Sequence, residues 1–149
     1  MPGYRYIPGQ RPHPFRHEGG HQHHHPDPLT DVLWDLDRPW QEDVRYLHGQ
    51  DLFDQRYLWE SHELWEAIWH AVPRDRPERQ LLQGLIQVAA SLLKLHMGST
   101  AAAGRLAERA QGRLVRAAPG GGTLWGVNVN ALCMGIQGAQ SGGPWPTLQ

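Results

Sequence analysis

The segment from Trp59 to His70, with the sequence WESHELWEAIWH, decides how the rest of this chain folds. At about 100° per residue, a helical wheel places one set of side chains on a single side of a helix: Leu58, His62, Trp65, Glu66 and Trp69. That side is expected to face the core, with His62 and Glu66 in its middle. Buried ionisable groups cost several kcal/mol unless they are paired or ligated. The segment therefore predicts a helix with a polar site inside an aromatic face.

Further helices are predicted on both sides of this segment. Apolar periodicity and turn residues indicate helices over residues 39–54, 57–72, 77–97 and 100–117, with a short fifth helix from about Val129. Pro77 suits the first position of the third helix, with Asp75 as its N-cap. No convincing strand is seen. The pattern predicts an all-α fold, a compact bundle of four main helices arranged as two helical hairpins.

The third helix contains a glycine, Gly84, that is unfavourable in a helix interior unless another group packs closely against it. We expect a tryptophan of the preceding helix to be that neighbour.

Three regions of different composition are expected. Residues 1–28 form a flexible arm rich in His, Pro and Gly, residues 29–118 a helical domain, and residues 119–149 a Gly-rich linker with the short helix and a disordered tail. The arm contains six of the ten histidines: His13, His17, His21, His23, His24 and His25. Its run HQHHH, residues 21–25, could chelate a divalent transition metal. A flexible polar arm and part of an expression tag are the alternatives, and Gln22, which interrupts the run, disfavours the tag.

Charge and cysteine content restrict the function classes. The formal net charge is −1, so no strong field favours nucleic acid or anionic lipid. A basic stripe on the 100–117 helix lacks interleaved aromatic residues and is interpreted as a solvated face: Arg105, Arg109, Arg113 and Arg116. Cys133 is the only cysteine, which excludes a disulfide within one chain. We see no signal-like or membrane-spanning apolar run and expect a cytoplasmic protein.

Residues 43–117 resemble a known family. The segment LFDQRYLWESHELWEAIWH, followed by LLQGLIQVAA, is similar to the bacterial and archaeal family numbered 309 among the domains of unknown function. The family pattern corresponds here to two sets of residues: Tyr57, Glu60, Ser61, His62, Glu63, Glu66 and Trp69, then Leu82, Gln83, Gly84, Leu85, Ile86 and Gln87. Ser61 replaces the usual alanine. The resemblance implies a compact helical domain and supplies no activity.

The candidate polar site extends over two helices. Its residues are Glu60, His62, Glu63, Glu66, Trp69, Gln83, Gln87 and Lys94. The motif His-Glu-x-x-Glu differs from the zinc-protease motif His-Glu-x-x-His in its second ligand. His62 and Glu66 could still hold a divalent metal such as Zn²⁺ with a third ligand, either His70 or Glu63. Alternatively, His62 and Glu66 form hydrogen bonds with Gln83 and Gln87 that fix the helix register, or they act in acid–base catalysis.

Two functions follow from this site. The first is a non-enzymatic binding module for a small ligand or protein, and the alternative is a divalent-metal-dependent, hydrolase-like enzyme that uses the same residues. Self-association through an exposed helix face is a third candidate. We expect neither a nucleic-acid nor a membrane partner.

Overall fold

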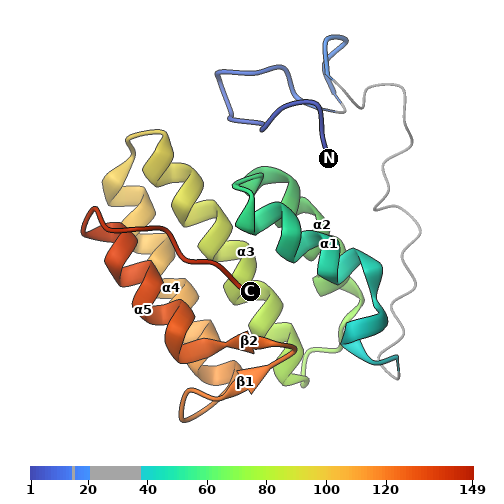
Figure 1. Cartoon of the computed structure of the whole chain (residues 1–149), viewed down its shortest axis with the longest axis vertical. Coiled ribbons are helices and arrows are strands. Elements are labelled where there is room, and N and C mark those ends of the chain that lie inside the picture. The colour runs from blue at the N-terminus through green and yellow to red at the C-terminus, as the bar shows by residue number, and fades with distance from the viewer. Residues whose placement is uncertain (15, 21–37) are drawn as a thin grey trace.

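The computed structural model describes residues 1–14, 16–20 and 38–149 (Figure 1). The histidine run His23–His25 therefore lies outside the described residues. Within them the elements are a 3₁₀ turn, five α-helices and a small hairpin: η1 Trp40–Glu42, α1 Val44–Asp54, α2 Leu58–Ala71, α3 Pro77–His96, α4 Thr100–Ala117, β1 Thr123–Leu124, β2 Val127–Asn128 and α5 Val129–Gln140. The predicted all-α fold is confirmed, including the fifth helix.

Helix α3 is the centre of the bundle. It packs against α2 on one side and against α4 on the other, while α1 pairs with α2 and α5 with α4 (Figure 1). Its inner surface consists of leucine, valine, alanine and serine side chains, and Leu81, Leu85 and Leu92 have no exposed area. The two predicted helical hairpins therefore share one core.

One predicted helix start and one predicted N-cap differ from the structure. The first helix begins at Val44 and not at residue 39, because the Asp43 carboxylate accepts hydrogen bonds from the backbone N–H groups of Arg45 and Tyr46 and so caps α1. Helix α3 begins at Pro77 as predicted, but its N-cap is Arg76, which makes no side-chain capping bond. The expected capping role of Asp75 is therefore wrong.

The hairpin β1–β2 was not predicted. Leu124 pairs with Val127 in an antiparallel register, and the turn residues Trp125 and Gly126 have φ values of 47° and 77°. Two consecutive positive φ angles are typical of a type I′ hairpin turn. Strands of two residues are too short to show a period-2 pattern, so the hairpin has no recognisable signal in the sequence.

The tryptophan expected beside Gly84 lies beside another glycine, Gly49. A Cβ on Gly84 would lie 2.8 Å from Leu114 Cδ2, so the helix that approaches Gly84 is α4 and no tryptophan is involved. The tryptophan of α2 lies instead over Gly49 of α1, where a Cβ would be 2.4 Å from Trp65 Nε1. Both glycines thus allow close helix packing. Helix α4 approaches Gly84, and Trp65 of α2 approaches Gly49.

The C-terminal segment, expected to be disordered, is held against the α1–α2 connection. The Arg56 guanidinium donates to the backbone oxygens of Pro146, at 2.7 Å, and Trp145, at 3.1 Å. The backbone N–H of Leu148 donates to Asp54 Oδ1 at 2.8 Å. Arg56 also has a φ of 68°, in the left-handed region that non-glycine residues rarely adopt. The expectation of disorder therefore differs from the structure at these residues.

Candidate functional site

The buried face of α2 is formed by Leu58, Ser61, Trp65 and Ile68. His62 and Glu66 are half-buried and lie at the edge of this face, so their expected position in its middle is not what the structure shows. Ser61 takes a central position with no exposed area, and its hydroxyl donates to the backbone oxygen of Leu58 at 3.1 Å. The small, internally bonded serine lets α2 approach its neighbours there.

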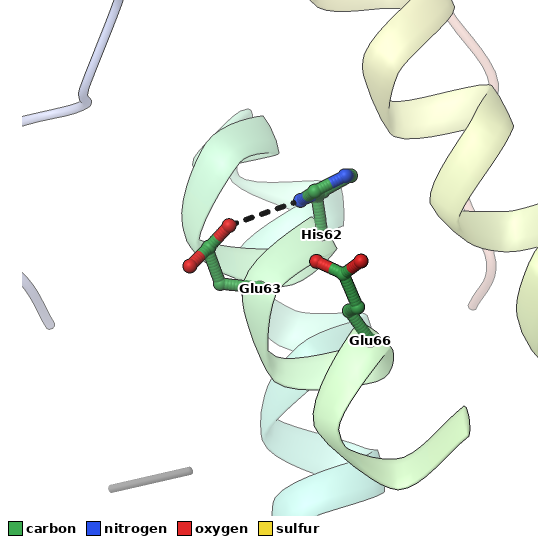
Figure 2. A group of neighbouring side chains, drawn as sticks. All are labelled: His62, Glu63 and Glu66. Carbon is green, nitrogen blue, oxygen red and sulfur yellow. Dashed lines mark ion pairs between the residues drawn. The ribbon is translucent and has the colours of Figure 1, made fainter. Parts of the chain in front are cut away.

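Three of the predicted residues come together on one side of α2. His62, Glu63 and Glu66 each offer one ligand atom, and these atoms all lie within 4.8 Å of one another. Figure 2 shows the two carboxylates turned toward the imidazole of His62. His62 Nδ1 is 3.4 Å from Glu63 Oε1, and the two side chains keep 22% and 27% of their area exposed. The group is therefore sheltered but still reachable from solvent.

His62 Nδ1 is a buried nitrogen without a hydrogen-bond partner among the described residues. Its approach to Glu63 has the distance of an ion pair but not the geometry of a hydrogen bond. A buried polar atom that is left unsatisfied costs about 1–3 kcal/mol. Such an atom beside two carboxylates fits a site that is completed by a cation.

The predicted third ligand His70 lies apart from this group. It is exposed, and its ring meets the edge of the Trp69 ring at a centroid distance of 4.9 Å. Among the described residues, the group that can hold a metal contains Glu63 in its place. Trp69 itself is half-buried under the guanidinium of Arg79, 4.2 Å from its ring centroid. Trp69 and His70 therefore belong to the end of α2 and not to the polar group.

The polar partners expected on α3 do not join the group. In the described part of the chain, no hydrogen bond links His62 or Glu66 to Gln83 or Gln87, and Gln87 Oε1 is buried without a partner. Gln87 lines a hollow beside α4. Lys94 is half-buried near the end of α3. The hydrogen-bond network expected to fix the helix register is therefore not formed.

The N-terminal residues reach the other end of the site. The backbone N–H of Tyr6 donates to Glu60 Oε1 at 3.0 Å, and the Tyr6 ring meets the Trp59 ring edge-on at 4.9 Å. The other neighbours of the Trp59 ring are the imidazoles of His62, stacked at 5.6 Å, and His13, at 5.8 Å. Tyr6 and His13 were not among the predicted site residues, because no sequence pattern relates them to residues some 50 positions away.

Two ionisable groups at this end have shifted pKa values. Burial raises the pKa of Glu60, and the hydrogen bond from Tyr6 only partly opposes the shift. Burial and the neighbouring Arg16 guanidinium lower the pKa of His13, while the carboxylate of Glu63 acts in the opposite direction. Both shifts act toward the neutral form of the side chain.

We expect Glu60→Gln to make the protein more stable at pH 7 and to leave its stability nearly unchanged near pH 4. The folded-state pKa of Glu60 is raised, so the folded state loses stability as the pH rises above about 4.3, the usual glutamate value. Glutamine keeps the acceptor for Tyr6 without the charge. Urea unfolding at both pH values measures the difference, with the exposed Glu42→Gln as the matched control. A variant that is less stable than wild type at pH 7 would contradict this expectation.

Comparisons with known proteins relate part of this chain to one family. None of the helices in the described residues is long and apolar enough to cross a membrane. No match is found among curated proteins or among solved structures. The sequence model of one family, described as "Domain of unknown function (DUF309)", matches residues 46–106, which run from α1 into α4 and include the whole of α2. The resemblance seen in the sequence is thereby confirmed: the helical segment 46–106 is similar to the family DUF309.

Proposed function

We propose that this chain is a small helical binding module that holds a divalent transition-metal ion such as Zn²⁺ on α2, through His62, Glu63 and Glu66. The observation that carries the proposal is the convergence of three ligand atoms within 4.8 Å of one another. The unsatisfied, buried His62 Nδ1 supports it.

The distances and charges suit zinc. Tetrahedral Zn²⁺ with bonds of about 2.0–2.1 Å keeps neighbouring ligand atoms roughly 3.3–3.4 Å apart. His62 Nδ1 and Glu63 Oε1 are 3.4 Å apart already. One neutral imidazole and two carboxylates carry a charge that balances a divalent cation, which matters for a half-buried site. Glu66 offers an oxygen within 4.8 Å of the other ligand atoms.

Zinc titration of the tag-free chain by calorimetry tests the proposal. We expect one ion to bind at the α2 site and His62→Ala to weaken that binding by at least about tenfold, because an imidazole ligand is lost. His23, His24 and His25 are replaced by glutamine in every protein compared, so that the arm does not contribute.

His70→Ala is the matched control, because His70 lies on the same helix outside the group. It should bind zinc like the parent protein. Absence of stoichiometric binding in the parent, or an equal loss in both variants, would refute the proposal.

A hydrolase-like enzyme at the same site is the second candidate. Its support is the number of ligands: catalytic zinc sites use three protein ligands and leave a fourth position to water, and the exposed fractions of His62 and Glu63 allow water to enter. Hydrolysis of an activated ester by the zinc-loaded parent but not by His62→Ala would distinguish this candidate from simple binding.

A further inference from the structure

Polar side chains of α3 and α4 that the metal site does not use meet on one side of the bundle. Together they line a hollow of about 660 Å³, and its lining residues are Gln87, Glu108, Arg109, Gly112, Arg113 and Arg116. The arginines belong to the stripe that the sequence suggested was merely solvated. Gln87 had been expected to face α2. In the structure, Gln87 of α3 and the arginines of α4 line the same hollow.

In the part of the chain that the structure describes, the three arginines of the hollow have no ion-pair partner. They occupy positions i, i+4 and i+7 and therefore lie on one helix face. Within the described residues, none of Arg109, Arg113 and Arg116 forms an ion pair, and the Nη1 group of Arg113 donates to the neutral Gln80 Oε1 at 3.0 Å. Like charges at this spacing destabilise a helix. The arrangement is unfavourable for folding alone and favourable for binding an anion.

Gln87 adds a second polar group to the wall of the hollow. Its Oε1 atom is buried and has no hydrogen-bond partner in the described part of the protein. A glutamine amide has an acceptor end and a donor end that differ little in shape. If an anion occupies the hollow, the side-chain amide of Gln87 can rotate by half a turn, so that its NH₂ group takes the place of Oε1. The NH₂ group then donates hydrogen bonds to the anion.

Gly112 keeps the hollow open. Glycine inside a helix costs about 1 kcal/mol relative to alanine, so it normally needs a packing reason. A Cβ on Gly112 would meet only the guanidinium of Arg116, at 3.7 and 3.8 Å, with no neighbouring helix in the way. Close helix packing therefore does not explain this glycine, whereas access for a bound group to the helix surface does.

We propose that this hollow between α3 and α4 binds a small anion that carries a phosphate group. Guanidinium groups match the oxygens of phosphate in bidentate geometry, and three of them converge here beside one carboxylate, that of Glu108. The volume is sufficient for more than a single phosphate. Inorganic phosphates and small phosphate monoesters share this chemistry, and both are compared below.

Calorimetric titration of the full-length, metal-free protein with inorganic pyrophosphate, inorganic phosphate and glycerol phosphate tests the proposal. We expect saturable binding of at least one probe, which weakens as salt is added because the charges are screened. Arg113→Gln should weaken that binding about tenfold or more, since a charge-assisted hydrogen bond is lost. Preference for glycerol phosphate would identify an organic monoester as the ligand class, and preference for pyrophosphate an inorganic one.

Two control variants on the same helix separate a site from general charge. Arg105→Gln removes one exposed positive charge from α4 outside the hollow and should leave the affinity within about twofold. Gly112→Ala places a methyl group in the hollow, whereas Gly104→Ala places one in open space, so only the former should weaken binding. The proposal is overturned if no probe saturates, or if Arg105→Gln weakens binding as much as Arg113→Gln does.

Discussion

Replacing Trp65 with alanine is expected to lower the free energy of unfolding by about 3–5 kcal/mol, a typical cost for removing a large buried ring. Trp65 has no exposed area, lies over Gly49 and contacts Phe53 at a ring-centroid distance of 5.7 Å. It therefore joins α1 to α2. Domains of this size have total stabilities of about 5–15 kcal/mol, so the variant should be close to unfolding. Urea unfolding followed by circular dichroism measures the loss.

The same contact predicts an energetic coupling between Trp65 and Gly49. Gly49→Ala should destabilise the protein by about 1–3 kcal/mol, because its Cβ would lie 2.4 Å from Trp65 Nε1. In a Trp65→Leu background the extra methyl group has room, and the same substitution should cost much less. A double-mutant cycle isolates this coupling.

Trp145→Ala is the control for the loss of an indole, since Trp145 is half-buried and should contribute less. An equal cost of Gly49→Ala in both backgrounds would show that its effect does not arise from the indole.

Zinc is expected to raise the melting temperature by roughly 5–11 °C at a free concentration about one hundred times its Kd. Binding to the folded state alone stabilises it by about 2.7 kcal/mol under these conditions, and each kcal/mol shifts the transition of a chain of about 150 residues by about 2–4 °C. Glu63→Gln and Glu66→Gln should each reduce the shift, because a neutral amide is a poorer ligand for Zn²⁺ than a negatively charged carboxylate.

The shift should also diminish at acid pH, where protons compete for the ligand atoms. Scanning calorimetry at several zinc concentrations, with the arm histidines His23–His25 replaced as above, provides the measurement. His48→Ala alters an exposed histidine on α1 and should keep the full shift. A shift that survives in the Glu63 and Glu66 variants would place the bound zinc elsewhere.

Local sequence signals identified the helices but not their neighbours. Proline positions and apolar spacing located α2, α3 and α4 to within about two residues, because these signals act within a single turn. Which element approaches Gly84 depends instead on the crossing of α3 and α4. Gly84 indicated close packing in the sequence but did not indicate its partner. Tertiary contacts of this kind have no local pattern.

The candidate site shows the same division. Spacing placed His62 and Glu66 one turn apart, which the structure retains, and Glu63 had remained an alternative third ligand beside His70. The helical wheel gave the wrong orientation for the core-facing side of α2, because the fully buried Ser61 offers no hydrophobic signal. The side chain of Glu63 turns back toward His62. A helical wheel gives only the direction in which each side chain leaves the helix, so it does not predict this rotamer.

The bonds between Arg56 and the C-terminal segment affect the order in which the chain folds. They connect residues 89 and 90 positions apart, whereas consecutive helices of the bundle contact one another across short loops. Closing so long a loop is entropically unfavourable until the intervening helices are compact. The last residues therefore attach late, after the helices have assembled, and are among the first to detach when the protein opens.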